Sequence, residues 1–387
     1  MDGGGKGGPS RRSAVRPFVA MDVLAAANRR EAEGVRVIHM EVGQPSAATP
    51  KAVVAAARKG LADDRLGYTE ALGIPPLRRR IARHYADAYG VDVDPARIAI
   101  TTGSSGGFML AFLAAFDAGA RVAVTTPGYP AYRNILQSLD LEAVEIPISP
   151  NRPVLDTEML AEAHAATPLD GVLIASPANP TGSMLTPEGL AAVIQAAEAR
   201  GIRFISDEIY HGLVFGGRTE TALRTSEDAI VINSFSKYYC MTGWRVGWMV
   251  LPEDLVRPVE RLAQNLYICP PDLSQRAAIG AFDAIDELEA VKATYAESRR
   301  LLLDRLPQLG FEGLYPVDGA FYVYASTRKL AADSEVFARD MLAHAGIAAT
   351  PGIDFDLTHG SEFIRFSFAG APADMAEATD RLQAWLK

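Results

Sequence analysis

Short apolar runs alternate with longer helix-forming segments through the centre of the chain, and this alternation constrains the fold more than any other feature of the sequence. The segments between the runs, such as residues 187–200, repeat apolar side chains at helical spacing. Strands that are apolar throughout and alternate with helices are typical of a mostly parallel sheet between helices. We therefore predict an α/β domain whose buried strands lie at residues 121–126, 171–175, 202–206, 230–234 and 246–251.

The C-terminal part of the chain has a different order of strand-like and helix-forming segments. A long amphipathic stretch from about residue 283 to 306 leads into two apolar runs, at residues 321–324 and 363–368, and two helix-forming segments, at residues 335–345 and 373–386. This mixture predicts a smaller α+β domain beside the large one. We therefore divide the chain into a flexible glycine-rich tail, an N-terminal segment that joins the small domain, a large domain and the small C-terminal domain, at residues 1–14, 15–45, 46–285 and 286–387.

The bulk composition excludes several classes of protein. A chain of 387 residues suits two domains, and 49% hydrophobic with 22% charged residues is ordinary for a soluble globular protein. The net charge of −9 argues against nucleic-acid binding, which needs a basic face. No apolar stretch approaches the roughly 20 residues that span a bilayer, and the N-terminus lacks the apolar core of a signal peptide. With 2 cysteines and no disulfide framework, we expect a cytoplasmic protein without membrane or nucleic-acid partners.

Ionisable side chains stand where two of the predicted strands end. Asp207 directly follows the run at 202–206, and Lys237 comes shortly after the run at 230–234, with Arg245 a few residues further on. In open α/β sheets, ligands bind beyond the carboxyl ends of the strands. A lysine at such an end can form a Schiff base beside a bound phosphate, and an aspartate can hold a pyridinium nitrogen. Pyridoxal phosphate chemistry requires this combination.

A series of short motifs supports that interpretation. In order they are residues 42–45 (VGQP), 67–73 (GYTEALG), 102–107 (TGSSGG), 127–130 (PGYP), 176–182 (SPANPTG), 207–210 (DEIY), the segment around Lys237, and Arg365. Each motif alone is a weak signal, but the whole series in this order is a strong one. From about residue 15 to its C-terminus, the chain resembles the fold-type I pyridoxal-phosphate enzymes of the class I/II aminotransferase family, in the aspartate-aminotransferase-like branch.

The resemblance implies roles for the side chains that face the cofactor ring. Lys237 would hold pyridoxal phosphate covalently and, once released by a substrate amine, would move a proton. Asp207 would keep the ring nitrogen protonated, although a helix N-cap is its structural alternative. Asn179 and Tyr210 would donate hydrogen bonds to the phenolate oxygen of the ring, and Tyr129 would stack on the ring. The predicted catalytic residues are therefore Lys237, Asp207 and Tyr210.

A Gly/Ser-rich turn is predicted to bind the cofactor phosphate. Residues 103–106 precede a helix that we expect at about residues 108–116, and the free N–H groups of a helix start favour an anion. The resemblance adds hydroxyl and guanidinium groups near Lys237, and a tyrosine from the neighbouring subunit of a homodimer with shared active sites. The predicted phosphate ligands are Gly103, Ser104, Ser105, Ser234, Ser236, Arg245 and, from the neighbouring subunit, Tyr68.

Arg365 is the predicted ligand of the substrate carboxylate. It lies among apolar residues of a predicted strand, where a charge needs a partner, and a structural salt bridge is the alternative. The resemblance implies that Arg365 binds the α-carboxylate as a planar fork, assisted by Gly43 and Asn179. Residues 16–21 (RPFVAM), which the family places near the substrate, are largely apolar. We therefore favour a neutral or hydrophobic amino acid as substrate.

The predicted function is the exchange of an amino group between an amino acid and a 2-oxo acid by a ping-pong route. The same motifs also suit a β-elimination lyase on the same scaffold, and a non-catalytic cofactor-binding module is a further alternative. The 6 histidines and 2 cysteines show no metal-ligand spacing, so no metal is expected.

Overall fold

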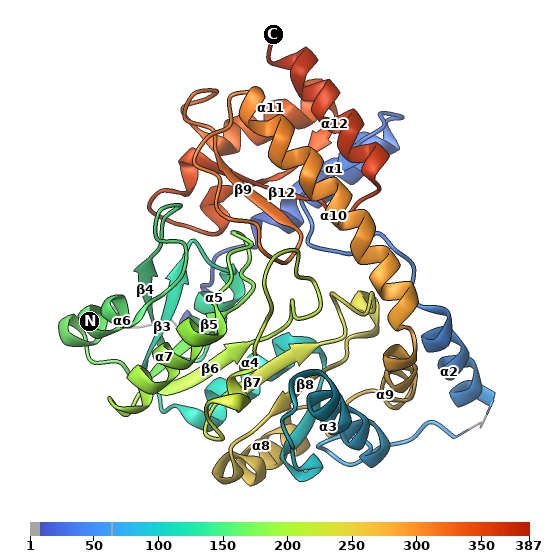
Figure 1. The fold of residues 1–387 in the computed structure, drawn as a ribbon, viewed down its shortest axis with the longest axis vertical. Coiled ribbons are helices and arrows are strands. Elements are labelled where there is room, and N and C mark those ends of the chain that lie inside the picture. The colour runs from blue at the N-terminus through green and yellow to red at the C-terminus, as the bar shows by residue number, and fades with distance from the viewer. Residues whose placement is uncertain (1–7, 63–64) are drawn as a thin grey trace.

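A seven-stranded sheet forms the centre of the larger part of the molecule (Figure 1). The computed structural model describes residues 8–62 and 65–387. The strands of the sheet are Ile98–Thr101 (β2), Arg121–Thr126 (β3), Glu142–Pro147 (β4), Gly171–Ala175 (β5), Arg203–Asp207 (β6), Ile230–Ser234 (β7) and Gly247–Val250 (β8). Their order is β2-β8-β7-β6-β5-β3-β4; neighbours from β7 to β4 are parallel, and β8 is antiparallel to both β7 and β2. The predicted α/β class with a mostly parallel sheet is confirmed.

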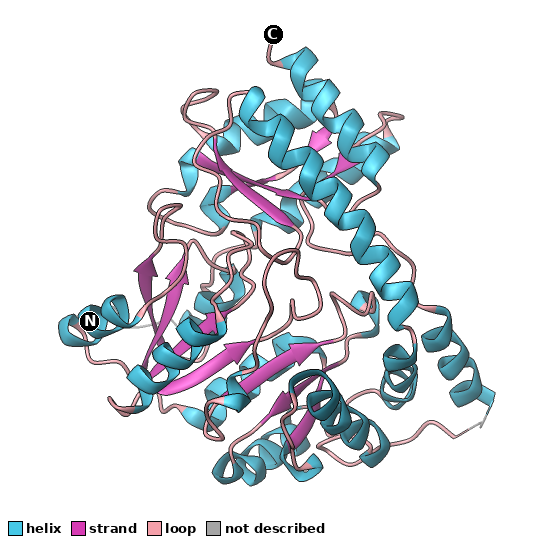
Figure 2. Cartoon of the chain, in the orientation of Figure 1, coloured by secondary structure: helices cyan, strands magenta, loops and turns pink. Residues whose placement is uncertain are grey.

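Both faces of this sheet are buried, which explains why apolar residues follow one another along its central strands. In β5, Val172 and Ile174 lie in one core cluster and Leu173 lies in another. In β7, Val231 belongs to the first cluster and Ile232 to the second. Because side chains alternate between the two faces of a strand, each cluster fills one face of the sheet. Helices cover both faces (Figure 2).

Two strands of the sheet, β4 and β2, were not predicted from the pattern of apolar residues. The edge strand β4 carries two glutamates, and Ile146 is its one buried residue. Strand β2 is buried throughout, but with 4 residues it is too short for the pattern to stand out. The other five strands lie within one residue of their predicted bounds, because consecutive apolar residues form the centre of each.

Two small sheets form the C-terminal part, as expected for a smaller α+β unit. Strands Tyr322–Ser326 (β9), Thr350–Pro351 (β11) and Phe363–Ser367 (β12) form an antiparallel sheet in the order β11-β12-β9. Strand Ile38–His39 (β1) pairs in parallel with Ile347–Ala348 (β10), so the N-terminal segment lies with the C-terminal part. The domain boundaries after residues 45 and 285 stay a prediction. Of the predicted flexible tail, residues 1–7 lie outside the described residues, and Arg11–Ser13 forms a short 3-10 helix.

Long helices surround both parts (Figure 1). The longest, α10, runs from the large sheet toward the small one, close to the bounds that the sequence predicts. Among the described residues, no helix combines the length and the apolar character needed to cross a membrane. The helices are Val19–Ala32 (α1), Lys51–Ala62 (α2), Pro75–Tyr89 (α3), Gly103–Ala115 (α4), Pro130–Ser138 (α5), Thr157–Ala166 (α6), Pro187–Glu198 (α7), Glu253–Leu266 (α8), Asp272–Ile279 (α9), Ile285–Gln308 (α10), Ser334–Ala345 (α11) and Pro372–Trp385 (α12).

Candidate active site

A cavity of about 500 Å³ lies beyond the carboxyl ends of the parallel strands, and most of the predicted site residues line it. Turns after β3, β5, β6 and β7 reach it from the large sheet, whereas Arg365 and Tyr322 reach it from the small sheet. Helix α1 closes one side. The predicted residues in its wall are Gly43, Ser104, Ser105, Tyr129, Asn179, Asp207, Tyr210, Ser236, Lys237, Arg245 and Arg365.

Asp207 ends β6 as a buried carboxylate, 2% exposed. Its Oδ1 accepts a hydrogen bond from the Ile209 N–H at 3.1 Å, and its Oδ2 accepts one from the Tyr132 hydroxyl. Burial raises the pKa of Asp207 to about 6, although these two bonds and the charge of Lys237 oppose the rise. The chain after Asp207 forms turns and not a helix, so the capping alternative has no helix to cap. A buried carboxylate of this kind fits a cationic pyridinium nitrogen, which would neutralise it.

Lys237 follows β7 and is half-buried, with its ammonium donating a hydrogen bond to the carbonyl of Gly43. Burial, together with the nearby charges of Arg365 and Arg245, lowers the pKa of Lys237 to about 8, although the charge of Asp207 opposes the shift. A lysine with a depressed pKa has a larger neutral fraction near neutral pH, and the neutral amine is the nucleophile. The local chemistry of Lys237 therefore fits attachment to the aldehyde of pyridoxal phosphate.

The first turn of α4 and the loop after β7 form the predicted phosphate cradle. The helix begins at Gly103, so the predicted start near residue 108 is wrong. Glycine disfavours helices, but here close packing requires a glycine in the first turn. Gly103 has φ of +73°, and a Cβ there would lie 2.4 Å from Nη2 of Arg245. The guanidinium of Arg245 thus sits against the positive end of α4, which suits an anion. Ser234 lies outside the cavity wall, but its hydroxyl donates to Oγ of Ser236 at 2.9 Å.

Arg365 is held in β12 with its guanidinium between two aromatic rings, at 4.4 Å from the ring centre of Tyr322 and 4.6 Å from that of Phe355. Its Nη1 donates to Oδ1 of Asn179 at 3.0 Å, and its Nη2 donates to the carbonyl of Glu41. Arg365 is 2% exposed, and no carboxylate of the described residues forms an ion pair with it. The structural salt bridge is therefore not made. The charge of Arg365 is attracted at longer range to Asp354, and a buried guanidinium without a carboxylate in contact fits a substrate carboxylate.

Two tyrosines and Asn179 approach the centre of the cavity. The hydroxyls of Tyr210 and Tyr322 are 2.8 Å apart. Because Oδ1 of Asn179 accepts from Arg365, the amide nitrogen of Asn179 remains as the donor. Tyr129 is half-buried, and its ring meets the ring of Phe18 edge-on at 6.0 Å.

The N-terminal end of α1 forms the apolar wall of the cavity. Phe18, Met21 and Leu24 line it. The first N–H groups of α1 have no partner within their own helix, and a carboxylate from a remote part of the chain binds them. Oδ1 of Asp354 accepts from Val19 N–H at 3.1 Å, and Oδ2 accepts from Ala20 N–H at 3.2 Å.

Sequence reasoning missed several residues that hold the site together. Tyr132 binds Asp207, Tyr322 and Phe355 sandwich Arg365, and Asp354 holds α1. None of them belongs to a motif. The spacing of Tyr132 from Tyr129 on the helix after the PGYP turn is the one signal that points into the cavity.

Three predicted site residues do not line the cavity: Gly103 and Ser234 lie against the wall residues Arg245 and Ser236, whereas Tyr68 lies away from the cavity. Tyr68 is 83% exposed and lines a separate surface hollow beside Thr69 and Arg276. The role predicted for it needs a second subunit.

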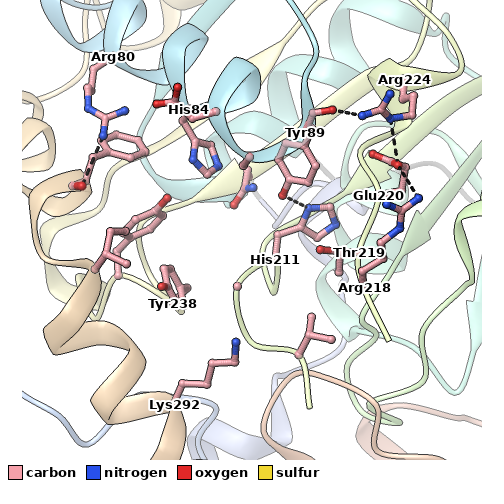
Figure 3. Close-up of a pocket in the computed structure, with 18 residues that line it drawn as sticks. Arg80, His84, Tyr89, His211, Arg218, Thr219, Glu220, Arg224, Tyr238 and Lys292 are labelled. Atoms are coloured by element: carbon pink, nitrogen blue, oxygen red, sulfur yellow. Dashed lines mark hydrogen bonds and ion pairs between the residues drawn. The ribbon is translucent and has the colours of Figure 1, made fainter. Parts of the chain in front are cut away.

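A second cavity, of about 550 Å³, lies behind the strand-end turns (Figure 3). Helix α3, the start of α10 and the loop around residues 211–224 enclose it. None of the predicted site residues lines it, but His211 follows Tyr210 and Tyr238 follows Lys237, so its wall is the reverse side of the turns that carry those residues.

Known proteins share this fold and much of this sequence. Residues 35–382 match the family model of class I and II aminotransferases. The valine–pyruvate aminotransferase of Mycobacterium tuberculosis is 51% identical over 381 residues, with 97% of each chain covered. The (5-formylfuran-3-yl)methyl phosphate transaminase of Methanocaldococcus jannaschii is 35% identical over 374 residues, covering 95% of this chain and 96% of that protein.

The solved structures agree. A crystal structure of an aminotransferase from Mycobacterium tuberculosis matches with a TM-score of 0.96 at 50% identity, covering 98% of this chain and 99% of that one. The comparisons favour amino-group transfer over β-elimination and over a non-catalytic module, and members of the matched family use pyridoxal phosphate. The chain therefore belongs to the class I and II aminotransferases, and it is an enzyme that transfers amino groups with pyridoxal phosphate.

Proposed function

We propose that the enzyme transfers the amino group of a neutral, aliphatic amino acid such as valine to a small 2-oxo acid such as pyruvate. The observation that carries this proposal is the apolar wall at α1, where Phe18, Met21 and Leu24 face the cavity. The similarity to the valine–pyruvate aminotransferase of Mycobacterium tuberculosis supports the same substrate class.

The charges in the cavity support this choice. Among the described residues of its wall, the cations are Lys237, Arg245 and Arg365. The proposed roles of these three are attachment of the cofactor, binding of its phosphate and binding of the substrate α-carboxylate. A second carboxylate, on an acidic side chain, has no further cation to meet there, and a buried charge without a partner costs free energy.

The proposed roles of the other residues follow from their positions. Bound pyridoxal phosphate supplies the electron sink that stabilises negative charge at Cα of the substrate. Asp207 would hold the ring nitrogen protonated, and Asn179 and Tyr210 would donate to the phenolate oxygen. Tyr129 would lie against the ring. Lys237, once its amine is free, would move the proton at Cα.

We predict that valine is used at least about a hundredfold better than aspartate, as kcat/KM with pyruvate as acceptor. An unpaired buried carboxylate costs about 3 kcal/mol or more, and about 1.4 kcal/mol corresponds to a tenfold change. The Met21→Arg variant supplies a cation on the apolar wall and should raise the relative rate with aspartate. Met21→Gln is the uncharged control and should not. Equal use of aspartate and valine by the unchanged enzyme contradicts the proposal.

We also propose a homodimer whose active sites are completed across the interface. Large apolar side chains are exposed in two segments, at Leu66 and Tyr68 and at Leu266 and Ile268. These segments lie side by side, because Thr69 N–H donates to Sγ of Cys269 at 3.3 Å. An exposed apolar patch of this kind favours a protein partner, and a second copy would bring Tyr68 to the neighbouring phosphate cradle.

Tyr68→Phe should weaken cofactor retention by roughly ten- to a hundredfold. A hydrogen bond to a charged group is typically worth about 1.5–3 kcal/mol, and about 1.4 kcal/mol corresponds to a factor of ten. Mixing Tyr68→Phe with Lys237→Ala gives a sharper test at limiting cofactor. One site of the heterodimer collects both defects and the other collects neither, so activity should return on mixing. Verified subunit exchange without returning activity, or an active monomer in sedimentation, argues against shared sites.

A further inference from the structure

The buried side chain of His211 joins two of the turns that carry the active site. It is 7% exposed and lies directly after Tyr210. Its Nε2 is 3.1 Å from the carbonyl oxygen of Ser176. Its Nδ1 is 2.7 Å from the hydroxyl of Tyr89 (Figure 3). The imidazole therefore bridges helix α3, the turn after β6 and the turn after β5.

The partners of the ring determine which nitrogen of His211 carries the proton. A carbonyl oxygen can only accept, so Nε2 carries the hydrogen and donates to Ser176. Nδ1 is then the acceptor, and the hydroxyl of Tyr89 donates to it. Burial lowers the pKa of His211 to about 3, so the ring stays neutral and keeps this single tautomer. Oε2 of Glu208, at 3.6 Å from Nδ1, is too distant for a hydrogen bond.

Ser176 connects this histidine to the centre of the site. It is the first residue after β5, and its turn carries Asn179. Its N–H donates to the carbonyl of Asp207 at 3.4 Å, and its own carbonyl accepts from His211. The turn with Asn179 is thus tied to the turn with Tyr210 by two hydrogen bonds, of which the His211 bond is the shorter and the one made by a side chain.

We propose that His211 is a positioning residue that fixes the distance between Asn179 and Tyr210, so that both side chains reach the phenolate oxygen of the cofactor together. His211 does not line the active-site cavity. The inference rests on the proposed roles of Asn179 and Tyr210 as donors to that oxygen. Donors to the phenolate favour the deprotonated form of the lysine-bound cofactor and lower its pKa. Loosening the donors should raise that pKa.

The test is an absorbance titration of the lysine-bound cofactor in the holoenzyme. His211→Asn cannot reach Ser176, and we expect the cofactor pKa to rise by about 0.5–1 unit, since a net hydrogen bond of about 1 kcal/mol corresponds to somewhat less than one pKa unit. His211→Gln keeps an N–H donor at the place of Nε2 and should restore most of the unchanged value. Tyr89→Phe removes the donor to Nδ1 and should give a smaller rise.

Two controls separate the possible outcomes. His84 lines the second cavity and meets the ring of Tyr89, but among the described residues no side-chain hydrogen bond joins it to the active-site turns. His84→Phe keeps a ring there and should leave the cofactor pKa unchanged. Tyr210→Phe removes a proposed donor and should raise the pKa.

If Tyr210→Phe raises the cofactor pKa but His211→Asn and Tyr89→Phe do not, the positioning role of His211 is wrong. If Tyr210→Phe itself has no effect, the proposed role of Tyr210 is wrong. A rise in His211→Asn that His211→Gln does not reverse also overturns the inference. Thermal unfolding of each variant reports whether it folds.

Discussion

Lys237→Ala should lower turnover by at least about 10⁴-fold while the protein still folds. The substitution removes the amine that attaches the cofactor and the group that moves the proton at Cα, and a positioned acid–base group alone contributes about 10²–10⁴-fold. The loss should appear in single-turnover measurements of valine with excess enzyme. Near-normal turnover together with the absorbance of a covalently bound cofactor contradicts the assignment.

Lys237→Arg is the matched control for this prediction. It keeps a positive charge near Gly43, but a guanidinium stays protonated and cannot attack an aldehyde. We expect it to lose turnover as severely as the alanine variant. If Lys237→Arg were much more active than Lys237→Ala, charge and not nucleophilic attack would be the contribution of this residue.

Asp207→Asn should slow the removal of the Cα proton by roughly a hundred- to several thousandfold. Removing one partner of a buried charge pair costs about 3–5 kcal/mol, and about 1.4 kcal/mol corresponds to a tenfold change. The rate of exchange of the Cα hydrogen of valine with deuterated solvent measures this step directly. Tyr132→Phe, which removes a hydroxyl bound to the same carboxylate, serves as a control and should have a much smaller effect. An unchanged exchange rate in Asp207→Asn returns Asp207 to a structural role.

The pH dependence of stability gives a second readout for Asp207 in the cofactor-free protein. The pKa of its carboxyl is raised to about 6 in the folded state from the ordinary 3.8. The folded state therefore binds more protons than the unfolded state between these values, and its stability falls as the pH rises through them. The Asp207→Asn variant should lack this decrease, as measured by urea unfolding across that range of pH.

The sequence predicts the chemical centre of this enzyme better than the walls that enclose it. Asp207 and Lys237 are predictable because they follow apolar strands, and the carboxyl ends of parallel strands meet at one edge of a sheet. Tyr132 and Tyr322 belong to no motif, and their partners lie 75 and 112 residues away in the chain. The bond from Asp354 to Ala20 spans 334 residues. Such contacts depend on how the small and large sheets are packed, which local spacing does not encode.

The start of α4 was mispredicted for a related reason. Glycine has a low intrinsic helix propensity, so a Gly/Ser-rich stretch is interpreted as a turn. In the fold, Gly103 must be a glycine because the guanidinium of Arg245 approaches the backbone of the first turn there. The steric demand of a residue that is remote in the sequence outweighs the local propensity.

The bond from Asp354 to helix α1 has a consequence for how enzymes of this design can diversify. The short turn that holds α1 through Asp354 also places the ring of Phe355 on Arg365, so one element supports both the apolar wall and the proposed carboxylate ligand. The reacting groups come from a different part of the chain, at the ends of the large sheet. Exchange of a few side chains on α1 can therefore retune which amino acids are accepted, while the electron-withdrawing machinery stays untouched. The residues proposed to select the substrate and those proposed to react with it thus lie on separate segments of the chain.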